Sequence, residues 1–334
     1  MEDLKAVSRL IAGQNKRADR HVGYCGIEAA EILHTLEQEF DSMQLERHFT
    51  LAVWEEQIVG VLGFDVDLDS SSDSHSGSRP ARAEIWGPFV DWETLELQDE
   101  DAASDEACGQ WIDSLWSTAL ARAGLESLVL QGFYHEKNVK AGALMQRVGA
   151  SLTGQHMTLA LSREDFQAYL DQADQGGEEA STSDLRIMDL GVEWAEAFVR
   201  LHDEVFPGSY ASGSALLHER DAEHRLIGCV REGRLLGYAF VSGSREFAEG
   251  DIEFLAAAPQ ARGEGVGLAL LQAALRILFE AFEPHEVRLT VSMSNLAAIG
   301  LYRKCGFQTR EEMKVYEMQF LLDSPGFTLD FLRE

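Results

Sequence analysis

The strongest constraint on the fold of this chain is an internal repeat. Residues 138–150 (NVKAGALMQRVGA) align with residues 295–307 (NLAAIGLYRKCGF), with Asn, Ala, Leu, a basic residue and Gly at matching positions. Two earlier pairs of segments continue the repeat: 83–92 with 250–259, and 51–64 with 227–240. Because self-similarity in a consistent register indicates duplicated structural units, the sequence predicts two copies of one fold.

The separation between the aligned segments falls from 177 to 167 and then to 157 residues along the chain. The first copy therefore carries two extra segments, which we place at 69–80, expected to be a flexible loop, and at 93–107. The polar stretch 171–184 (DQADQGGEEASTSD) has the composition of a linker. We expect domains at 1–170 and 185–334 joined by this linker.

In the second copy, the hydrophobic pattern predicts strands that alternate with amphipathic helices. Strands are expected at 185–190, in a hairpin over 224–243, and at 251–258, 287–293 and 312–320; helices are expected at 192–206, 214–220, 267–282 and 296–305. The alternation indicates an α/β fold, and the hairpin requires a mixed sheet. The predicted fold class is thus α/β (an α+β mixed sheet), with two tandem domains that each hold a mixed, mostly antiparallel sheet flanked by helices.

The charge of the chain excludes some partners. With 28 Lys and Arg against 57 Asp and Glu, the formal net charge is −29. Nucleic-acid binding needs clustered basic residues, so no nucleic-acid partner is expected. The acidity fits either general solubility or attraction of a cationic, amine-bearing substrate, and composition does not separate these two interpretations.

Other sequence features argue against a membrane, a disulfide framework and a metal. No apolar run reaches the length of a membrane span, and the first residues do not form a secretory signal, so a cytoplasmic location is expected. The four cysteines (Cys25, Cys108, Cys229 and Cys305) are far apart, and the histidines show no ligand spacing. We therefore expect neither disulfides nor a metal site.

Three glycines in five positions precede an apolar helical run, in the segment 262–267 (RGEGVG). The spacing lacks the Gly-Lys-Ser/Thr of a P-loop and differs from the G-x-G-x-x-G of a dinucleotide fold. What remains is a strand-to-helix junction whose free N–H groups bind an anion such as a diphosphate, with Arg262 adding a charged contact. The alternative is a loop that needs a positive φ at one or two positions.

Together with the strand DIEFLAAAP before it and the segment N-x-x-A-x-x-L-Y-R-K-x-G-F after it, this loop resembles the GNAT N-acetyltransferase superfamily over about 185–320. The resemblance implies acetyl-CoA as co-substrate, with its pyrophosphate on the glycine loop and its pantetheine arm along a central strand. Asn295 and Tyr302 are expected to face the cofactor, with Tyr302 near the sulfur. The implied cofactor-binding residues are Leu255, Ala256, Ala257, Arg262, Gly263, Glu264, Gly265, Val266, Gly267, Leu268 and Asn295.

Acetyl transfer to an amine needs a neutral nucleophile and a proton for the leaving thiolate. Only about one part in a thousand of an alkyl amine with a pKa near 10.4 is neutral at about pH 7.4, so a base would help. Asp251 and Glu253 are two apart on a strand and are expected on one face, with Glu253 favoured as the base because it is nearer the cofactor segment. Tyr302 is the candidate acid. Solvated surface carboxylates and a core tyrosine are the alternatives.

The first copy lacks these groups. The repeat aligns Leu255 with Pro88, Glu253 with Trp86 and Tyr302 with Met145. Proline has no N–H to donate, and methionine has no proton to give. Segment 97–110 replaces the glycine loop and carries five carboxylates that would repel a diphosphate. We therefore expect a degenerate first domain that neither binds acetyl-CoA productively nor catalyses.

The resulting prediction is an acetyl-CoA-dependent N-acetyltransferase whose second domain acts on a primary amine of a small molecule or peptide. The architecture resembles that of two-domain GNAT proteins, which predicts a monomeric pseudo-dimer or a homodimer. One alternative is a non-catalytic acyl-CoA-binding sensor or scaffold. Another is transfer to a hydroxyl group or of a longer acyl chain, which would use the same motifs.

Overall fold

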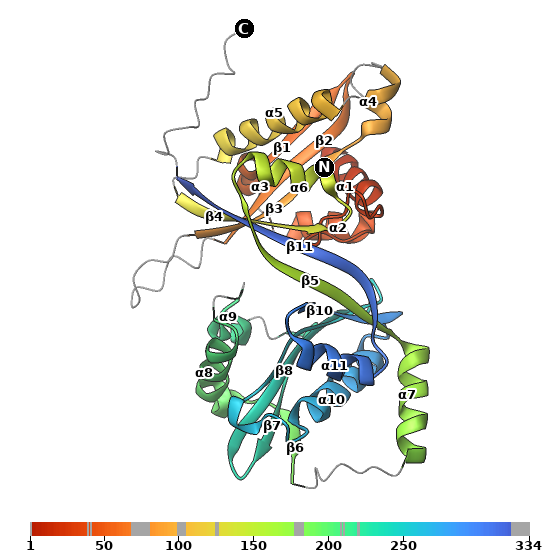
Figure 1. Cartoon of the computed structure of the whole chain (residues 1–334), viewed down its shortest axis with the longest axis vertical. Coiled ribbons are helices and arrows are strands. Elements are labelled where there is room, and N and C mark those ends of the chain that lie inside the picture. The colour runs from red at the N-terminus through yellow and green to blue at the C-terminus, as the bar shows by residue number, and fades with distance from the viewer. Residues whose placement is uncertain are drawn as a thin grey trace. The chain divides into compact units, whose positions relative to one another are not determined.

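The computed structural model describes residues 2–38, 40, 42–67, 81–98, 105–123, 127–176, 184–207, 209, 211–218 and 221–321. The chain divides into two compact units (Figure 1). The first unit combines residues Met1–His156 with Glu312–Glu334, and the second comprises Met157–Glu311.

The first unit holds a sheet whose strand order begins β1-β2-β3-β4-β11. Its strands pair antiparallel, except that β3 and β4 run parallel. Its elements are α1 (Glu2–Asn15), α2 (Ala29–Gln38), α3 (Ser42–His48), β1 (Phe49–Trp54), β2 (Gln57–Asp67), β3 (Ala81–Val90), α4 (Trp92–Gln98), α5 (Asp105–Ala123), β4 (Ser127–His135), α6 (Val139–Arg147), the start of β5 (Ser151–Ser162) and most of β11 (Gln308–Leu321).

The second unit repeats this plan with strand order β10-β9-β8-β7-β6, in which β9 and β10 form the parallel pair. Its elements after the end of β5 are α7 (Arg163–Gly176), β6 (Arg186–Asp189), the short 3₁₀ helix η3 (Val192–Trp194), α8 (Ala195–Val205), α9 (Gly213–His218), β7 (His224–Arg231), β8 (Arg234–Ser244), β9 (Glu249–Ala257), η4 (Pro259–Ala261), α10 (Val266–Ala281), β10 (Glu286–Ser292), α11 (Leu296–Lys304) and the start of β11. The predicted fold class, mixed sheets flanked by helices, is confirmed.

The internal repeat reappears in the bounds of matching elements. Strands β2 and β8 are offset by the 177 residues of the sequence alignment, and helices α6 and α11 by its 157 residues. Both helices have an asparagine N-cap, Asn138 or Asn295. Its side chain accepts a hydrogen bond from the backbone N–H of the residue three positions later. Both are followed by a glycine with positive φ, 81° at Gly149 and 94° at Gly306. The conserved spacing thus reflects one helix-capping scheme used twice.

The two units do not follow the domain boundaries expected at 1–170 and 185–334. Residues 313–321 of β11, which we assigned to the second domain, pair antiparallel with β4 in the first unit, and residues 157–162 of β5 belong to the second. Helix α7 also covers the first part of the linker expected at 171–184. A strand-like pattern shows that a segment pairs with something but carries no information about its partner, which explains the difference.

The extra segments of the first copy are only partly described. The loop expected at 69–80 lies outside the described residues. Of the segment 93–107, residues 93–98 belong to α4 and residues 105–107 begin α5.

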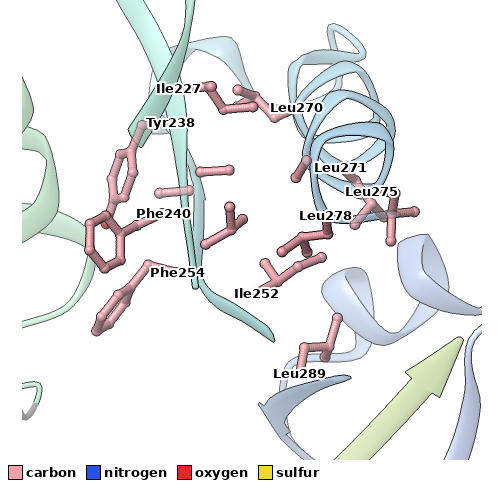
Figure 2. Close-up of a cluster of buried hydrophobic side chains, with 14 of the residues drawn as sticks. Ile227, Tyr238, Phe240, Ile252, Phe254, Leu270, Leu271, Leu275, Leu278 and Leu289 are labelled. Atoms are coloured by element: carbon pink, nitrogen blue, oxygen red, sulfur yellow. The ribbon is translucent and has the colours of Figure 1, made fainter. Parts of the chain in front are cut away.

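The central sheet of the second unit is buried on both faces. Figure 2 shows one face packed against α10 and the opposite face bearing aromatic side chains. The labelled residues on the α10 side are Ile227, Ile252, Leu270, Leu271, Leu275 and Leu278; those on the other side are Tyr238, Phe240 and Phe254. Each fully buried side chain of this kind stabilises the fold by about 1.5–3 kcal/mol, which fixes β9 firmly below α10.

Two glycines near the end of the repeat provide a matched test of the fold. Gly306→Ala should lower the melting temperature of the full chain by about 2–6 °C, because the left-handed backbone costs a non-glycine residue about 1–2 kcal/mol. A Cβ there would also lie 3.2 Å from Leu161. Gly300→Ala, in α11 with open space around it, should leave the melting temperature unchanged or raise it. Equal effects of both changes in calorimetry would contradict the capping scheme.

Candidate functional site

The glycine loop between β9 and α10 leaves a helix N-terminus without a cap. Gly263 and Gly265 have left-handed φ angles of 82° and 83°, and Gly265 occupies the N-cap position with no side-chain hydrogen bond. The Ala269 N–H makes the first bond into the helix, to the carbonyl of Gly265 at 3.0 Å. The N–H groups of Val266, Gly267 and Leu268 therefore point out of the helix end as available donors. Such an arrangement binds anions.

The third glycine has another role. A Cβ on Gly267 would lie 3.3 Å from the Leu301 side chain, so this glycine permits close packing of α10 against α11. The sequence pattern therefore combines two requirements, backbone conformation at the first two positions and helix contact at the third.

The charges on the loop are arranged asymmetrically. Glu264 forms an ion pair with Arg231, the last residue of β7, with 2.6 Å between Arg231 Nη2 and Glu264 Oε2. Arg262 is exposed and has no ion pair with any residue that the structure describes. The carboxylate of the loop is thus neutralised, while one guanidinium remains available for an anionic ligand.

The parallel strands beside this loop part after a single register pair. Asp251 of β9 stands opposite Arg288 of β10, and no further pair between the two strands follows it. Leu255, Ala256 and Ala257 continue to pair with β8 on their other edge. Their edge toward β10 is therefore not covered by that strand, and it runs directly into the glycine loop.

A β-bulge changes which side chains share a face of β9. Phe240 of β8 pairs with Phe254 and the next residue, Val241, pairs with Ile252, which makes Glu253 the extra residue. Ile252 and Phe254 consequently lie on opposite faces of the sheet (Figure 2). The alternation on which we expected Asp251 and Glu253 to share a face is broken at this point. Bulges re-aim side chains in this way and have no signal in the hydrophobic pattern.

Asp251 has the most perturbed carboxyl group near the parted strands. Burial raises its pKa to about 7; Arg288 opposes this shift, and the neighbouring carboxylates of Glu249, Glu253 and Glu286 add to it. Arg288 is itself held by Glu286, to which its Nε donates at 3.0 Å. A carboxyl group that titrates near neutral pH can exchange protons with a substrate, as a general base requires.

Tyr302 has the properties of a proton donor. It lies on α11 with 7% of its surface exposed, and its ring centroid is 5.7 Å from that of Phe307. Burial raises its pKa to about 12, which keeps the hydroxyl protonated at neutral pH. No hydrogen bond of this hydroxyl occurs among the described residues, so its proton is available to a ligand. The ring is part of the core and the hydroxyl is a candidate acid at the same time.

Asn295 has a local structural task. Its Oδ1 accepts a hydrogen bond from the Ala298 N–H at 3.2 Å and so caps α11. Asn138 does the same for α6 in the first unit. The capping role alone accounts for this asparagine in both copies, while the exposed side chain of Asn295 leaves its amide N–H groups for other contacts.

The sequence reasoning missed a buried polar pair on the other face of the sheet. His202 Nδ1 lies 2.6 Å from the hydroxyl of Tyr238, and its Nε2 lies 3.0 Å from the carbonyl oxygen of Ala211. Because a carbonyl only accepts, Nε2 donates and Nδ1 accepts the Tyr238 proton. Burial lowers the pKa of His202, which keeps the ring neutral. The pair connects the segment between α8 and α9 to the sheet. The sequence feature that could have revealed it is a histidine on the apolar face of α8.

In the first unit, a side chain bridges the two parallel strands at the corresponding place. Glu84 and Gln131 form the last pair of β3 and β4, at the positions equivalent to Asp251 and Arg288. Beyond this pair, the Tyr134 hydroxyl donates a hydrogen bond to the carbonyl of Gly87 at 2.9 Å. Tyr134 is fully buried, whereas its counterpart in the second copy is Val291, which has no hydroxyl.

In the described residues no cluster of three or more His, Cys, Asp and Glu has the geometry to hold a metal ion. No helix in the described part of the chain combines the length and apolar character needed to cross a bilayer.

Residues 191–307, which contain the uncapped, glycine-rich helix start and the two parted parallel strands, match the acetyltransferase (GNAT) family. This match confirms the resemblance that the glycine loop and the N-x-x-A-x-x-L-Y segment indicated.

Individual relatives support the same class. An N-alpha-acetyltransferase of Sulfurisphaera tokodaii is 25% identical over 154 residues, 42% of this chain and 92% of the relative. The fold of a GCN5-related N-acetyltransferase from Sphaerobacter thermophilus covers 95% of this chain and 93% of its own, with a TM-score of 0.63 and 16% identity. A tandem GNAT protein from the clavulanic acid biosynthesis pathway covers 95% of each chain, with a TM-score of 0.61 and 15% identity. The tandem fold is thus shared across both repeats.

The pair of Asp251 and Arg288 yields a direct test. Arg288→Gln should raise the pKa of Asp251 above 7, because the guanidinium charge that favours the carboxylate is removed. The shift is measured by carbon-13 NMR of the Asp251 carboxyl group across a pH titration. Arg310→Gln is the control, since Arg310 pairs with Glu286 and reaches Asp251 only through that carboxylate, so its effect should be the smaller one. An unchanged or lower pKa in the Arg288 variant would contradict the electrostatic account.

Proposed function

We propose that this chain is an acetyl-CoA-dependent N-acetyltransferase that acts through its second unit. The observation that carries the proposal is the uncapped N-terminus of α10, with Gly263 and Gly265 in left-handed conformations, directly beside the parted edge of β9. A diphosphate suits the helix end, since its charge is complemented by the N–H groups, the helix dipole and Arg262. An extended pantetheine arm suits the edge at 255–257, where β10 supplies no pairing.

The acceptor is a primary amine of a small molecule or peptide. An α-amino group has a pKa of about 7.7–8.0, close to that of Asp251, so proton transfer between the two is nearly balanced. A lysine amine, with a pKa near 10.4, would be a poorer match. The N-alpha-acetyltransferase relative is consistent with an α-amine, and the carboxylates around β9 would attract a cationic acceptor.

The proposed chemistry assigns one proton to each group. The amine nitrogen attacks the thioester carbon, and an N–H of the 255–257 segment stabilises the oxygen of the tetrahedral intermediate. Asp251 accepts the proton lost by the amine, directly or through water. When the carbon–sulfur bond breaks, the Tyr302 hydroxyl protonates the leaving thiolate. We favour Asp251 as the base over Glu253, which the sequence favoured, because burial raises the pKa of Asp251 to about 7.

The first unit is proposed to be non-catalytic. The Tyr134 hydroxyl bridges β4 to β3 at the place that corresponds to the parted strands of the second unit. Pro88 and Met145 stand at the positions of Leu255 and Tyr302, so a backbone donor and an acid are both missing. Each of these differences would separately prevent acetyl transfer in this copy.

Cofactor binding is tested with two glycines of like conformation. Gly265→Ala should raise the Kd for acetyl-CoA at least tenfold, because a Cβ at the helix start distorts the anion cradle. Gly233→Ala, in the β7–β8 turn with a φ of 72° and open space, imposes similar backbone strain without touching the loop. Isothermal titration should give one site per chain in wild type and in the Gly233 variant. Two sites would contradict the proposal for the first unit, and no binding would refute the cofactor.

Three side-chain changes test the chemistry. Tyr302→Phe should lower kcat about 10²-fold or more while Kd for acetyl-CoA stays the same, as expected for a general acid.

Asp251→Asn should abolish the rise of kcat/KM with pH near 7, whereas Glu253→Gln should preserve it. If Glu253→Gln removes this pH dependence instead, the base is Glu253. A chain that binds acetyl-CoA but shows no turnover with any amine would support the alternative of a non-catalytic sensor or scaffold.

A further inference from the structure

A pocket of ≈ 200 Å³ lies in the first unit, with Tyr134 as one of its lining residues. It is formed where the first turns of α6 stand over β4 and β11, and all of its lining residues belong to this unit. Tyr134, Val139 and Tyr316 supply its apolar walls, and Lys314 contributes an ammonium group. The proposed acetyl-CoA site in the second unit uses none of these residues.

Two hydrogen-bond donors in this pocket lack partners. Tyr316 is 93% buried, since 7% of its surface is exposed, and no hydrogen bond of its hydroxyl occurs among the described residues. Lys314 is half-buried, and none of the ion pairs in the described parts of the chain includes it. An unpaired, half-buried lysine is unexpected in a chain with 57 acidic and 28 basic residues. Neither donor is among the fully buried polar atoms that lack a partner, so both are accessible to water or to a ligand in the pocket.

The backbone aims both donors at the same place. Lys314 and Tyr316 are two residues apart on β11, so their side chains share one face of the sheet. That face is the one under α6, because a Cβ on Gly142 of α6 would lie 3.3 Å from the Tyr316 hydroxyl. The N-terminal turn of α6 also borders the pocket, and its dipole favours a negative charge.

The pocket depends on a small residue that the second copy lacks. Gly142 aligns with Ile299, whose side chain in the corresponding helix would fill the equivalent space. The lining combines apolar side chains with Lys314, the Tyr316 hydroxyl and three further polar residues, which suits an organic anion better than an inorganic one; those three residues are His135, Asn138 and Gln146. Glu136, the one carboxylate in the lining, is exposed at the rim and disfavours a ligand with a second negative charge.

We propose that the first unit binds a small organic monocarboxylate in this pocket, with the carboxylate held by Lys314 and Tyr316 and its carbon chain between the tyrosine rings and Val139. The site gives the unit that lacks the glycine loop a ligand of its own. It is independent of acetyl transfer, so it can be tested whether or not the second unit is an enzyme.

The test uses the full chain and sodium butyrate as the probe, with sodium phosphate and sodium chloride at equal ionic strength for comparison. Ligand-observed NMR should detect saturable binding of butyrate, with one site per chain, and weaker or no binding of phosphate. Lys314→Gln and Tyr316→Phe should each weaken butyrate binding at least tenfold, because each removes one donor. Gly142→Leu should abolish binding by filling the pocket with a residue that favours helix.

Lys137→Gln is the matched control, since Lys137 is exposed, carries the same charge and does not line the pocket. Butyrate binding in this variant should equal that of wild type. The proposal is overturned if butyrate does not bind, if phosphate binds equally well, or if the Lys314 and Lys137 variants behave alike. The Lys314 and Tyr316 changes remove polar groups near the surface of the pocket, so they keep the test decisive even if Gly142→Leu prevents folding.

Discussion

Parallel pairing between β9 and β10 stops at Asp251 and Arg288, and the candidate site depends on that early end. Strands that stayed paired would cover the edge at 255–257 and leave only a helix end on the surface. Because β9 is locked between α10 on one face and aromatic side chains on the other, its free edge is held rigidly. The parallel pair of β3 and β4 ends at the equivalent position, where the Tyr134 hydroxyl bonds to the carbonyl of Gly87. The same parting of strands is thus bridged by a side chain in the first unit, whereas Val291, at the position of Tyr134 in the second unit, has no hydroxyl to form such a bridge.

Electrostatics at this edge are a balance between burial and one cation. Burial and three neighbouring carboxylates favour the neutral form of Asp251, while Arg288 favours the charged form, and the result lies near neutrality. In a similar way, the negative charge of Glu264 in the glycine loop is neutralised by its ion pair with Arg231 of β7. In a chain with a net charge of −29, such local pairing lowers the repulsion that an anion would meet at the glycine loop.

The repeat, the element order and the glycine loop could be derived from the sequence because they rest on local rules. Positive φ at Gly263 and Gly265, asparagine caps at Asn138 and Asn295 and apolar periodicity all have short-range signals. Three features could not be derived from the sequence, because each depends on residues far apart in the chain. These are the bulge at Glu253, the His202–Tyr238 hydrogen bond and the pairing of β11 with β4. The raised pKa of Asp251 could not be derived from the sequence either, because burial depends on what packs around a strand and not on the pattern of the strand itself.

The assignment of β11 to the first unit has a consequence for synthesis. On the ribosome, β4 emerges about 180 residues before the strand that pairs with it, which at typical elongation rates means about 10–40 s. During that interval the sheet of the nascent first unit has an unsatisfied edge, whereas the second unit can pair β6 to β10 as soon as they appear. The unit that is translated first is therefore completed last, and its exposed strand edge is the point where a chaperone or a misfolded neighbour would act.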